Sequence, residues 1–166
     1  MGTIRPVHTD DSGTIARIYN HYIEKTIITF EEIRVTTSDM YTRILNITAN
    51  FPWRVYVDNG EVLGYAYAGE YKSRCAYRNT AEVSIYLKPT AQGKGIGSGL
   101  MANLLEQIRP LSLHALIGVI ALPNPASVRL HEKFGFTKVG HFKEVGFKFN
   151  QWIDVGYWEK ILSDTE

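Results

Sequence analysis

Residues 92–100 read QGKGIGSGL and carry glycines at positions 93, 95, 97 and 99. The apolar stretch EVSIYL before this segment predicts a buried strand, and LMANLLEQI after it predicts an amphipathic helix. Glycine costs backbone entropy, so four glycines at a strand-to-helix junction indicate that something approaches the bare backbone there. Free N–H groups at a helix N-terminus favour an anion, and a pyrophosphate is the natural occupant.

Two common nucleotide-binding motifs do not fit this segment. A P-loop ends in lysine followed by serine or threonine, whereas Lys94 is followed by Gly95. A dinucleotide fingerprint that begins at Gly93 needs its last glycine at position 98, which is Ser98. The segment therefore predicts another kind of pyrophosphate loop, with a glycine-rich turn that serves only tight packing as the alternative.

Composition and charge narrow the class of protein. The 166 residues predict a single domain over 1–166, and 45% hydrophobic residues suffice for a core. Lysine plus arginine (18) nearly balances aspartate plus glutamate (17), so the charge of +1 predicts no nucleic acid or membrane partner. The N-terminus lacks the apolar core of a signal peptide, and no apolar run reaches membrane-spanning length. We therefore expect a cytoplasmic protein.

Cysteine and histidine patterns argue against disulfides and metal sites. Cys75 is the single cysteine, which excludes an internal disulfide and a cysteine-based zinc site and fits a reducing compartment. The histidines show no spacing typical of shared metal ligands. We therefore expect no metal cofactor.

The hydrophobic pattern predicts both helices and strands. Residues 15–23 carry an apolar stripe at helical spacing, and Thr37 or Ser38 begins a second expected helix. Asn59 and Gly60 predict a tight turn between two strands, because this pair readily adopts positive φ angles.

Later segments complete the expected sheet. ALIGVIAL at 115–122 is almost continuously apolar, as a central strand covered on both faces should be. Pro125 begins a short expected helix that Gly135 ends, and the alternating tail predicts two closing strands. Together the elements predict an α+β fold, with a mixed, mostly antiparallel sheet and helices on both faces.

The glycine segment also resembles a family signature. QGKGIG is similar to the Gln/Arg-x-x-Gly-x-Gly/Ala motif of the GNAT superfamily of N-acetyltransferases, which cradles the pyrophosphate of acetyl-CoA. ALPNPASVRLHEKFGF resembles the second cofactor segment of that superfamily, and the order of elements agrees. Within the superfamily, NHYIEKTIITFEE, YAYAGEYKSRCAYRNTAEVSIYL, VIALPNPASVRLHEKFGF and GFKFNQWIDVGYW resemble the phosphinothricin and methionine sulfoximine acetyltransferases.

The resemblance implies the three-layer GNAT acyl-CoA N-acyltransferase fold and acetyl-CoA as cosubstrate. It implies that strand backbone flanks the pantetheine and acetyl group, with one N–H near Leu87 as oxyanion donor, and that loop amides hold the pyrophosphate. The implied cofactor-binding residues are Ile85, Tyr86, Leu87, Gln92, Gly93, Lys94, Gly95, Ile96, Gly97, Ser98 and Asn124.

Two residues are candidates for proton transfer. Glu82 begins the strand before the glycine segment, and the similar enzymes use a glutamate at the matching position as base; a solvated strand-end carboxylate is the alternative. His131 occupies the helix position where many superfamily members have a tyrosine that protonates the thiolate. A packing role for His131 is the alternative, so the sequence leaves the identity of the general acid open.

The basic stretch EYKSRCAYRN is the candidate acceptor site. In the resembled family it lines the amino-acid pocket, which implies Arg74 on the carboxylate with Lys72 and Tyr77 beside it, and Phe30 closing the pocket. A solvated basic loop is the alternative. Cys75 falls on a variable position of the pattern, and direct acetyl transfer needs no acyl-enzyme.

The sequence thus predicts acetyl transfer to the α-amine of a small amino acid or analogue, of the phosphinothricin, methionine sulfoximine or methionine sulfone type. Two alternatives are an acetylase of peptide N-termini or polyamines, although a polyamine site should be acidic, and a non-catalytic acyl-CoA sensor. The aromatic tail and the resemblance imply a homodimer.

Overall fold

Seven strands form one mixed sheet in this computed structural model, which describes residues 2–162. Their order is β1-β2-β3-β4-β5-β7-β6, and only β4 and β5 pair in parallel. The strands are β1 (Thr3–Pro6), β2 (Trp53–Asp58), β3 (Glu61–Glu70), β4 (Thr80–Leu87), β5 (Ala115–Leu122), β6 (Thr137–Lys148) and β7 (Gln151–Ile161). The α-helices are α1 (Ser12–Lys25), α2 (Thr37–Thr48), α3 (Ile96–Ile108) and α4 (Pro125–Lys133), with 3-10 turns η1 (Thr9–Asp11), η2 (Cys75–Tyr77) and η3 (Pro89–Ala91).

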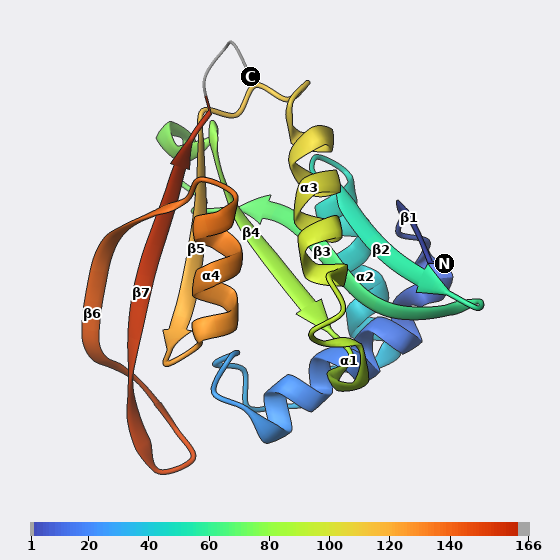
Figure 1. The fold of residues 1–166 in the computed structure, drawn as a ribbon, viewed down its shortest axis with the longest axis horizontal. Coiled ribbons are helices and arrows are strands. Elements are labelled where there is room, and N and C mark those ends of the chain that lie inside the picture. The colour runs from blue at the N-terminus through green and yellow to red at the C-terminus, as the bar shows by residue number, and fades with distance from the viewer. Residues whose placement is uncertain (1, 163–166) are drawn as a thin grey trace.

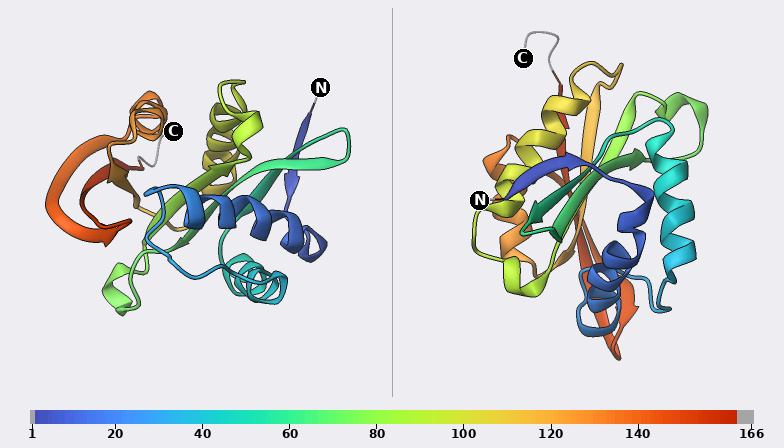
Figure 2. Two further views of the ribbon diagram at one scale, coloured as in Figure 1. Left: turned by 90° about the horizontal axis from the view of Figure 1, so that it is seen from below. Right: turned by 90° about the vertical axis from the view of Figure 1, so that its right-hand side faces the viewer.

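The predicted α+β class is confirmed. Figure 2 shows α3 and α4 on one face of the sheet and α1 and α2 on the other, as expected from the sequence. Met1 and residues 163–166 of the predicted domain lie outside the described residues.

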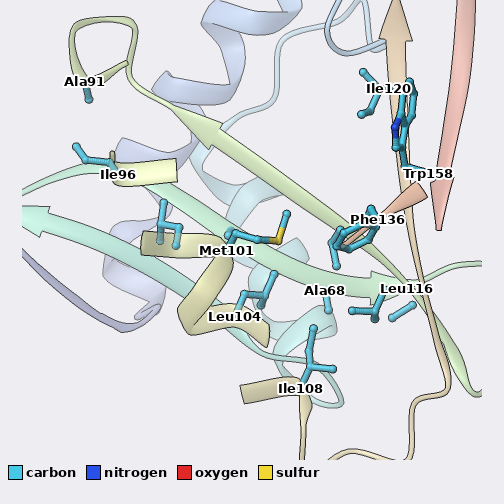
Figure 3. Packing of buried hydrophobic residues seen from close by; sticks show 14 residues of the cluster. Ala68, Ala91, Ile96, Met101, Leu104, Ile108, Leu116, Ile120, Phe136 and Trp158 are labelled. Atoms are coloured by element: carbon cyan, nitrogen blue, oxygen red, sulfur yellow. The ribbon is translucent and has the colours of Figure 1, made fainter. Parts of the chain in front are cut away.

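Each face of the sheet carries its own hydrophobic core. On the α3 face, Leu100, Met101 and Leu104 of the helix are buried in one cluster with Phe136 and Trp158 (Figure 3). On the α1 face, a second cluster is formed by residues that include Ile15, Ile23, Ile44, Trp53 and Tyr65. The two cores fix the sheet between helical layers, so side chains that alternate along a strand reach two different environments.

Local signals explain where the elements begin and turn. Oγ1 of Thr36 accepts a hydrogen bond from the Asp39 N–H (3.0 Å), and the Asp39 carboxylate accepts one from the Thr36 N–H (2.8 Å). This capping box begins α2 at Thr37, one of the two predicted starts. Asn59 and Gly60 have φ of 49° and 78°, as the predicted tight turn requires.

The pairing of β4 with β5 is the feature that positions the site. The two parallel strands pair only from Thr80 to Glu82 and from Ala115 to Ile117. Figure 1 shows them diverging beyond this point, with β4 running toward the glycine segment and β5 toward α4. The sheet is therefore open at its centre on the side where the glycine segment lies.

Candidate active site

The open side of β4 extends beyond the last residues that pair with β5. The Asn79 carbonyl accepts hydrogen bonds from the His114 and Ala115 N–H groups, so the Asn79 peptide faces β5. Peptide groups alternate along a strand, so those of Ile85 and Leu87 face the same way, beyond the last paired residues of β5. Their N–H groups point into the gap, as expected for a strand that flanks a pantetheine chain.

A cavity of about 410 Å³ opens at this gap. It is lined by residues of α1, β4, the glycine segment and α4. Of the predicted cofactor residues, it brings together Ile85, Leu87, Gln92, Gly93, Gly95, Gly97, Ser98 and Asn124. His131, predicted for proton transfer, lines the same cavity.

The glycine loop has the conformation and the space for a pyrophosphate. Gly93 and Gly95 have φ of +73° and +77°, and a Cβ on either would meet no atom within 4 Å. Gly95 precedes α3 without a side-chain cap, so the first N–H groups of the helix remain available to an anion. The positive φ angles explain why glycine is required, and the open space fits the predicted phosphate-binding role.

Three predicted cofactor residues do not line the cavity. Tyr86 pairs with Tyr65 of β3, and its ring packs against Tyr19 and Tyr22 on the α1 face. Ile96 is buried in the α3 core, and the side chain of Lys94 is exposed. The period-two alternation of β4 explains the difference at Tyr86, because neighbouring residues of a strand face opposite sides.

Other side chains at the cavity were not predicted. Tyr22 donates a hydrogen bond to the Leu87 carbonyl and accepts one from Nε2 of Gln92 (3.2 Å), which ties α1 to the end of β4 and to the start of the glycine segment. Lys133 and Arg129 line the cavity from α4, where they are one helical turn apart. This basic i, i+4 pair was visible in the sequence, whereas nothing there linked Tyr22 to Leu87.

His131 is buried, and one of its ring nitrogens has no hydrogen-bond partner in the described part of the chain. Its side chain is 5% exposed, and Nδ1 lies 2.8 Å from the Ser127 carbonyl oxygen. A carbonyl can only accept, so we infer that Nδ1 carries the proton and that Nε2, which has no partner within residues 2–162, presents a lone pair. Burial lowers the pKa of His131 below the usual histidine range. The residue is thus neutral near pH 7.

Glu82 lies on the opposite face, at the last paired position of β4 with β5. Its neighbours Ala81 and Val83 belong to the α3 core, so the alternation of the strand directs the Glu82 side chain toward the α1 face. The half-buried carboxylate forms no hydrogen bond within residues 2–162, and burial raises its pKa above the usual glutamate range. A carboxylate in this state suits the predicted role of base.

The basic loop at 71–79 lies on the same side of the sheet as α1 and α2 (Figure 2, left). The exposed Arg74 guanidinium forms no ion pair or hydrogen bond with the part of the chain that the structure describes. Lys72 Nζ lies over the rings of Tyr71 (5.1 Å) and Tyr77 (5.5 Å). The predicted cations are therefore available on the face to which Glu82 points.

Phe30 lies in the connection between α1 and α2. Its side chain is 41% exposed, and its ring lies against the backbone of Gly146 in β6. Phe30, Arg74 and Glu82 are not among the residues that line the 410 Å³ cavity. The structure thus separates the predicted acceptor residues from the predicted cofactor residues.

Three further findings concern metal sites, membrane spans and other cavities. Within residues 2–162, no cluster of three histidine, cysteine, aspartate or glutamate residues could hold a metal ion. In the same part of the chain, no helix is both long and apolar enough to cross a membrane. A second cavity, of about 620 Å³, contains none of the predicted site residues and lies between the end of α3 and β7.

Comparison with known proteins decides the family. The acetyltransferase (GNAT) domain matches residues 4–156. The chain belongs to the GNAT acetyltransferase family. The family resemblance found in the sequence and the GNAT fold that it implies are both confirmed.

Individual relatives of this GNAT acetyltransferase cover nearly its whole length. Phosphinothricin N-acetyltransferase of Streptomyces coelicolor is 37% identical over 163 residues, which are 96% of this chain and 95% of that protein. L-methionine sulfoximine/L-methionine sulfone acetyltransferase of Salmonella typhimurium is 33% identical over 163 residues (98% and 95%). The structure of a phosphinothricin acetyltransferase from Sinorhizobium meliloti, in complex with acetyl-CoA, matches with a TM-score of 0.95 at 36% identity, covering 98% of this chain and 89% of that one.

Proposed function

We propose that this GNAT acetyltransferase transfers the acetyl group of acetyl-CoA to the α-amine of a small amino acid or analogue. Phosphinothricin, methionine sulfoximine and methionine sulfone represent the acceptor class, which the names of the relatives support. The gap between β4 and β5 carries the proposal. It begins at Glu82, whose carboxylate is directed toward the α1 face, and the glycine-loop cavity opens along it.

The cofactor side rests on the glycine loop and on β4. We assign the pyrophosphate to the N–H groups from Gly93 to Ser98, and the pantetheine to the open edge at Ile85 and Leu87. Asn124 accepts a hydrogen bond from the Ser127 N–H (3.2 Å), which begins α4 beside the cavity. Acetyl-CoA, when bound, supplies the thioester, and a β4 N–H that faces the gap donates to the developing oxyanion.

Glu82 and His131 divide the proton transfers. Glu82 accepts a proton from the ammonium group of the amino acid, which leaves a neutral amine able to attack. As the C–N bond forms and the C–S bond breaks, the nitrogen loses a second proton to Nε2 of His131, which returns it to the departing thiolate. Burial lowers the pKa of His131, so its imidazolium is a stronger acid than an exposed one, which favours the return step.

The acceptor side rests on the basic loop. We assign the amino-acid carboxylate to the Arg74 guanidinium, whose planar fork matches two carboxylate oxygens, with Lys72 and Tyr77 beside it. Phe30 forms an apolar wall for the side chain of the amino acid. Arg74 has no competing partner in the described chain, which supports this assignment.

A substrate panel tests the proposal. Purified protein is mixed with acetyl-CoA and a thiol-detecting reagent, and amino-acid analogues, peptides with free N-termini and polyamines are compared as acceptors. Release of CoA with the amino-acid analogues is the expected result. Release only with peptides or polyamines, or tight binding of acetyl-CoA without turnover of any acceptor, would contradict the proposal.

We further propose that the whole chain acts as a single-domain homodimer in the cytoplasm. β6 is an edge strand, and side chains of the β6–β7 hairpin that include Phe142, Phe147 and Trp152 are more than half exposed. A second copy that covers this surface agrees with the dimer implied by the sequence. The exposed, free Cys75 thiol supports a reducing compartment. Sedimentation should show a dimer at micromolar concentration, and a monomer would contradict this assembly.

A further inference from the structure

The β6–β7 hairpin holds the α1–α2 connection through a buried lysine. Lys148, at the end of β6, is only 3% exposed. Its Nζ donates hydrogen bonds to the Thr26 carbonyl (2.8 Å) and the Thr29 carbonyl (2.7 Å) and lies 5.0 Å from the centre of the Phe149 ring. Figures 1 and 2 show the hairpin tip beside the segment that follows α1. Residues about 120 positions apart in the sequence are thereby joined.

Burying an ammonium group is energetically unfavourable. Burial lowers the pKa of Lys148, and the charge of nearby Glu32 acts in the opposite direction. A charged group buried without partners is strongly unfavourable, so the two carbonyl bonds are what stabilise the lysine there. An apolar side chain would fill the space without this requirement, but it would leave both carbonyl oxygens unpaired. The lysine therefore fixes the backbone of the connection in a way that packing alone does not.

Gly146 provides a second contact from the same strand. A Cβ built on Gly146 would lie 2.3 Å from Cζ of Phe30, so the ring rests directly on the bare backbone. Gly146 and Lys148 are two residues apart in β6 and lie on the same face of the strand. Their targets, Thr29 and Phe30, are adjacent. The hairpin thus fixes the backbone and the side chain of one short segment.

The other side of the connection is held by α1 and α2. The Tyr19 hydroxyl lies 2.8 Å from Oγ1 of the buried Thr29, and Arg43 forms a two-point ion pair with Glu31. These contacts anchor residues on either side of Phe30 to the helical layer. The ring of Phe30 is therefore located by two elements that are remote in sequence, the helix pair and the hairpin.

We propose that Lys148 and Gly146 are positioning residues that fix Phe30 as a wall of the acceptor site and thereby set the affinity for the amino acid. This rests on the proposed function, because Phe30 serves the acceptor only if a small amino acid binds there. Neither residue takes part in proton transfer: both hydrogen-bonded contacts of Lys148 are internal carbonyls, and Gly146 has no side chain.

The first test is steady-state kinetics with matched variants. Lys148→Met removes the charge and the two hydrogen bonds at similar length, and Gly146→Ala forces the Phe30 ring to move while Lys148 is intact. Both should raise KM for the amino acid about tenfold or more and leave KM for acetyl-CoA within about twofold. The controls are Lys143→Met, an exposed lysine of β6, and Gly140→Ala, whose Cβ would meet only an ordinary contact at 3.7 Å. Equal changes in both KM values would overturn the proposal.

A double-mutant cycle separates positioning from general destabilisation. If Lys148 and Gly146 act through the Phe30 ring, then Lys148→Met and Gly146→Ala should have almost no further effect on the amino-acid KM in a Phe30→Ala background. Fully additive effects would show that these residues act by another route, and would overturn the proposal.

Amide hydrogen exchange gives a readout that needs no acceptor. Residues 26–30 should exchange faster in Lys148→Met than in the wild type or in Lys143→Met, whereas the glycine loop should be unchanged. Unchanged exchange at 26–30 would overturn the role of Lys148 as a tether. If the wild-type enzyme acetylates no amino acid, the proposed function and the acceptor role both fail, while exchange still decides whether Lys148 holds the connection.

Discussion

Gly118 of β5 and His131 of α4 are in direct contact. A Cβ atom at position 118 would lie 2.6 Å from Cδ2 and 2.7 Å from Nε2 of the imidazole. Gly118 follows Ile117, the residue that pairs with Glu82, so His131 and Glu82 lie on opposite faces of the sheet at the same level. A glycine in the middle of a central strand weakens the strand, and here it allows the histidine to approach.

Replacement of Gly118 should displace the imidazole without removing it. In Gly118→Ala we expect kcat to fall by about 10²-fold, because a small displacement of a reacting group lowers the rate by a factor of this order. Gly140→Ala in β6 is the control, because its added Cβ would meet only an ordinary contact with Tyr157. Normal turnover in a folded Gly118→Ala enzyme would argue that the position of His131 does not matter to the reaction.

Glu82→Gln should lower activity and raise stability together. The rate at neutral pH should fall by roughly 10²–10⁴-fold, the usual contribution of a general base, and the loss should shrink as pH rises because more of the amine is already neutral. Because burial raises the pKa of Glu82, the unfolded chain ionises this group at lower pH than the folded chain does. Stability is therefore lost as pH rises through the folded pKa, and glutamine should restore it.

Kinetics and thermal unfolding of the same Glu82→Gln preparation check both effects. The variant should unfold at a higher temperature than the wild type at pH 7, and the difference should vanish below about pH 4, where both states are protonated. Near-normal turnover at pH 7 would remove Glu82 from the mechanism. An unfolding temperature below that of the wild type would contradict the claim that the buried charge of Glu82 destabilises the fold.

His131 should make the fold sensitive to mild acid. Burial lowers its pKa, so on acidification below about pH 6.5 the unfolded chain takes up a proton that the folded chain still excludes. Stability is present above that pH and declines below it until the folded imidazole also titrates. His131→Gln should flatten this decline between about pH 6.5 and 5. Denaturant unfolding against pH measures the slope, with the exposed His114→Gln as control; an unchanged slope in His131→Gln would exclude the buried neutral state.

Gly97→Ala tests the cofactor loop without straining the backbone. Gly97 lacks a positive φ, and its Cβ would make only ordinary contacts of 3.6 Å and 3.7 Å, with Leu130 and Leu87. Alanine in a helix is more favourable than glycine by about 0.5–1 kcal/mol, so the fold should be kept or stabilised. Acetyl-CoA should nevertheless bind more weakly in calorimetry, because the methyl group occupies the space of the ligand. Unchanged affinity in the folded variant would contradict the pyrophosphate assignment.

The features that the sequence predicted correctly, such as the start of α3, depend on residues close to them in the chain. The glycine segment determines its own positive φ angles and the start of α3, and Asn124 caps α4 from the adjacent position. The family motif occupies these same local positions, so the fold and the conformation of the glycine segment could be predicted together. Side chains alternate along β4, so the two-residue period of the strand already implied that Tyr86 faces away from Ile85, toward the α1 face.

Contacts between distant segments could not be predicted in the same way. The bond from Tyr22 to the Leu87 carbonyl, and those from Lys148 to Thr26 and Thr29, join residues that no short motif links. Each depends on how helices and the hairpin pack against the sheet, which is a property of the whole fold. The same holds for the unpartnered Nε2 of His131, because the sequence shows neither its burial nor its tautomer.

The central claim is that the acceptor is a free amino acid recognised through its carboxylate. The most direct measurement compares kcat/KM for L-methionine sulfone with that for its carboxamide, with mass spectrometry to identify the acetylated product, in the wild type and in Arg74→Lys. The account predicts α-N-acetylation of the free acid, with kcat/KM about 10²-fold above the amide in the wild type and a much smaller ratio in Arg74→Lys. Equal rates for acid and amide in the wild type, or no acetylation of either, would contradict it.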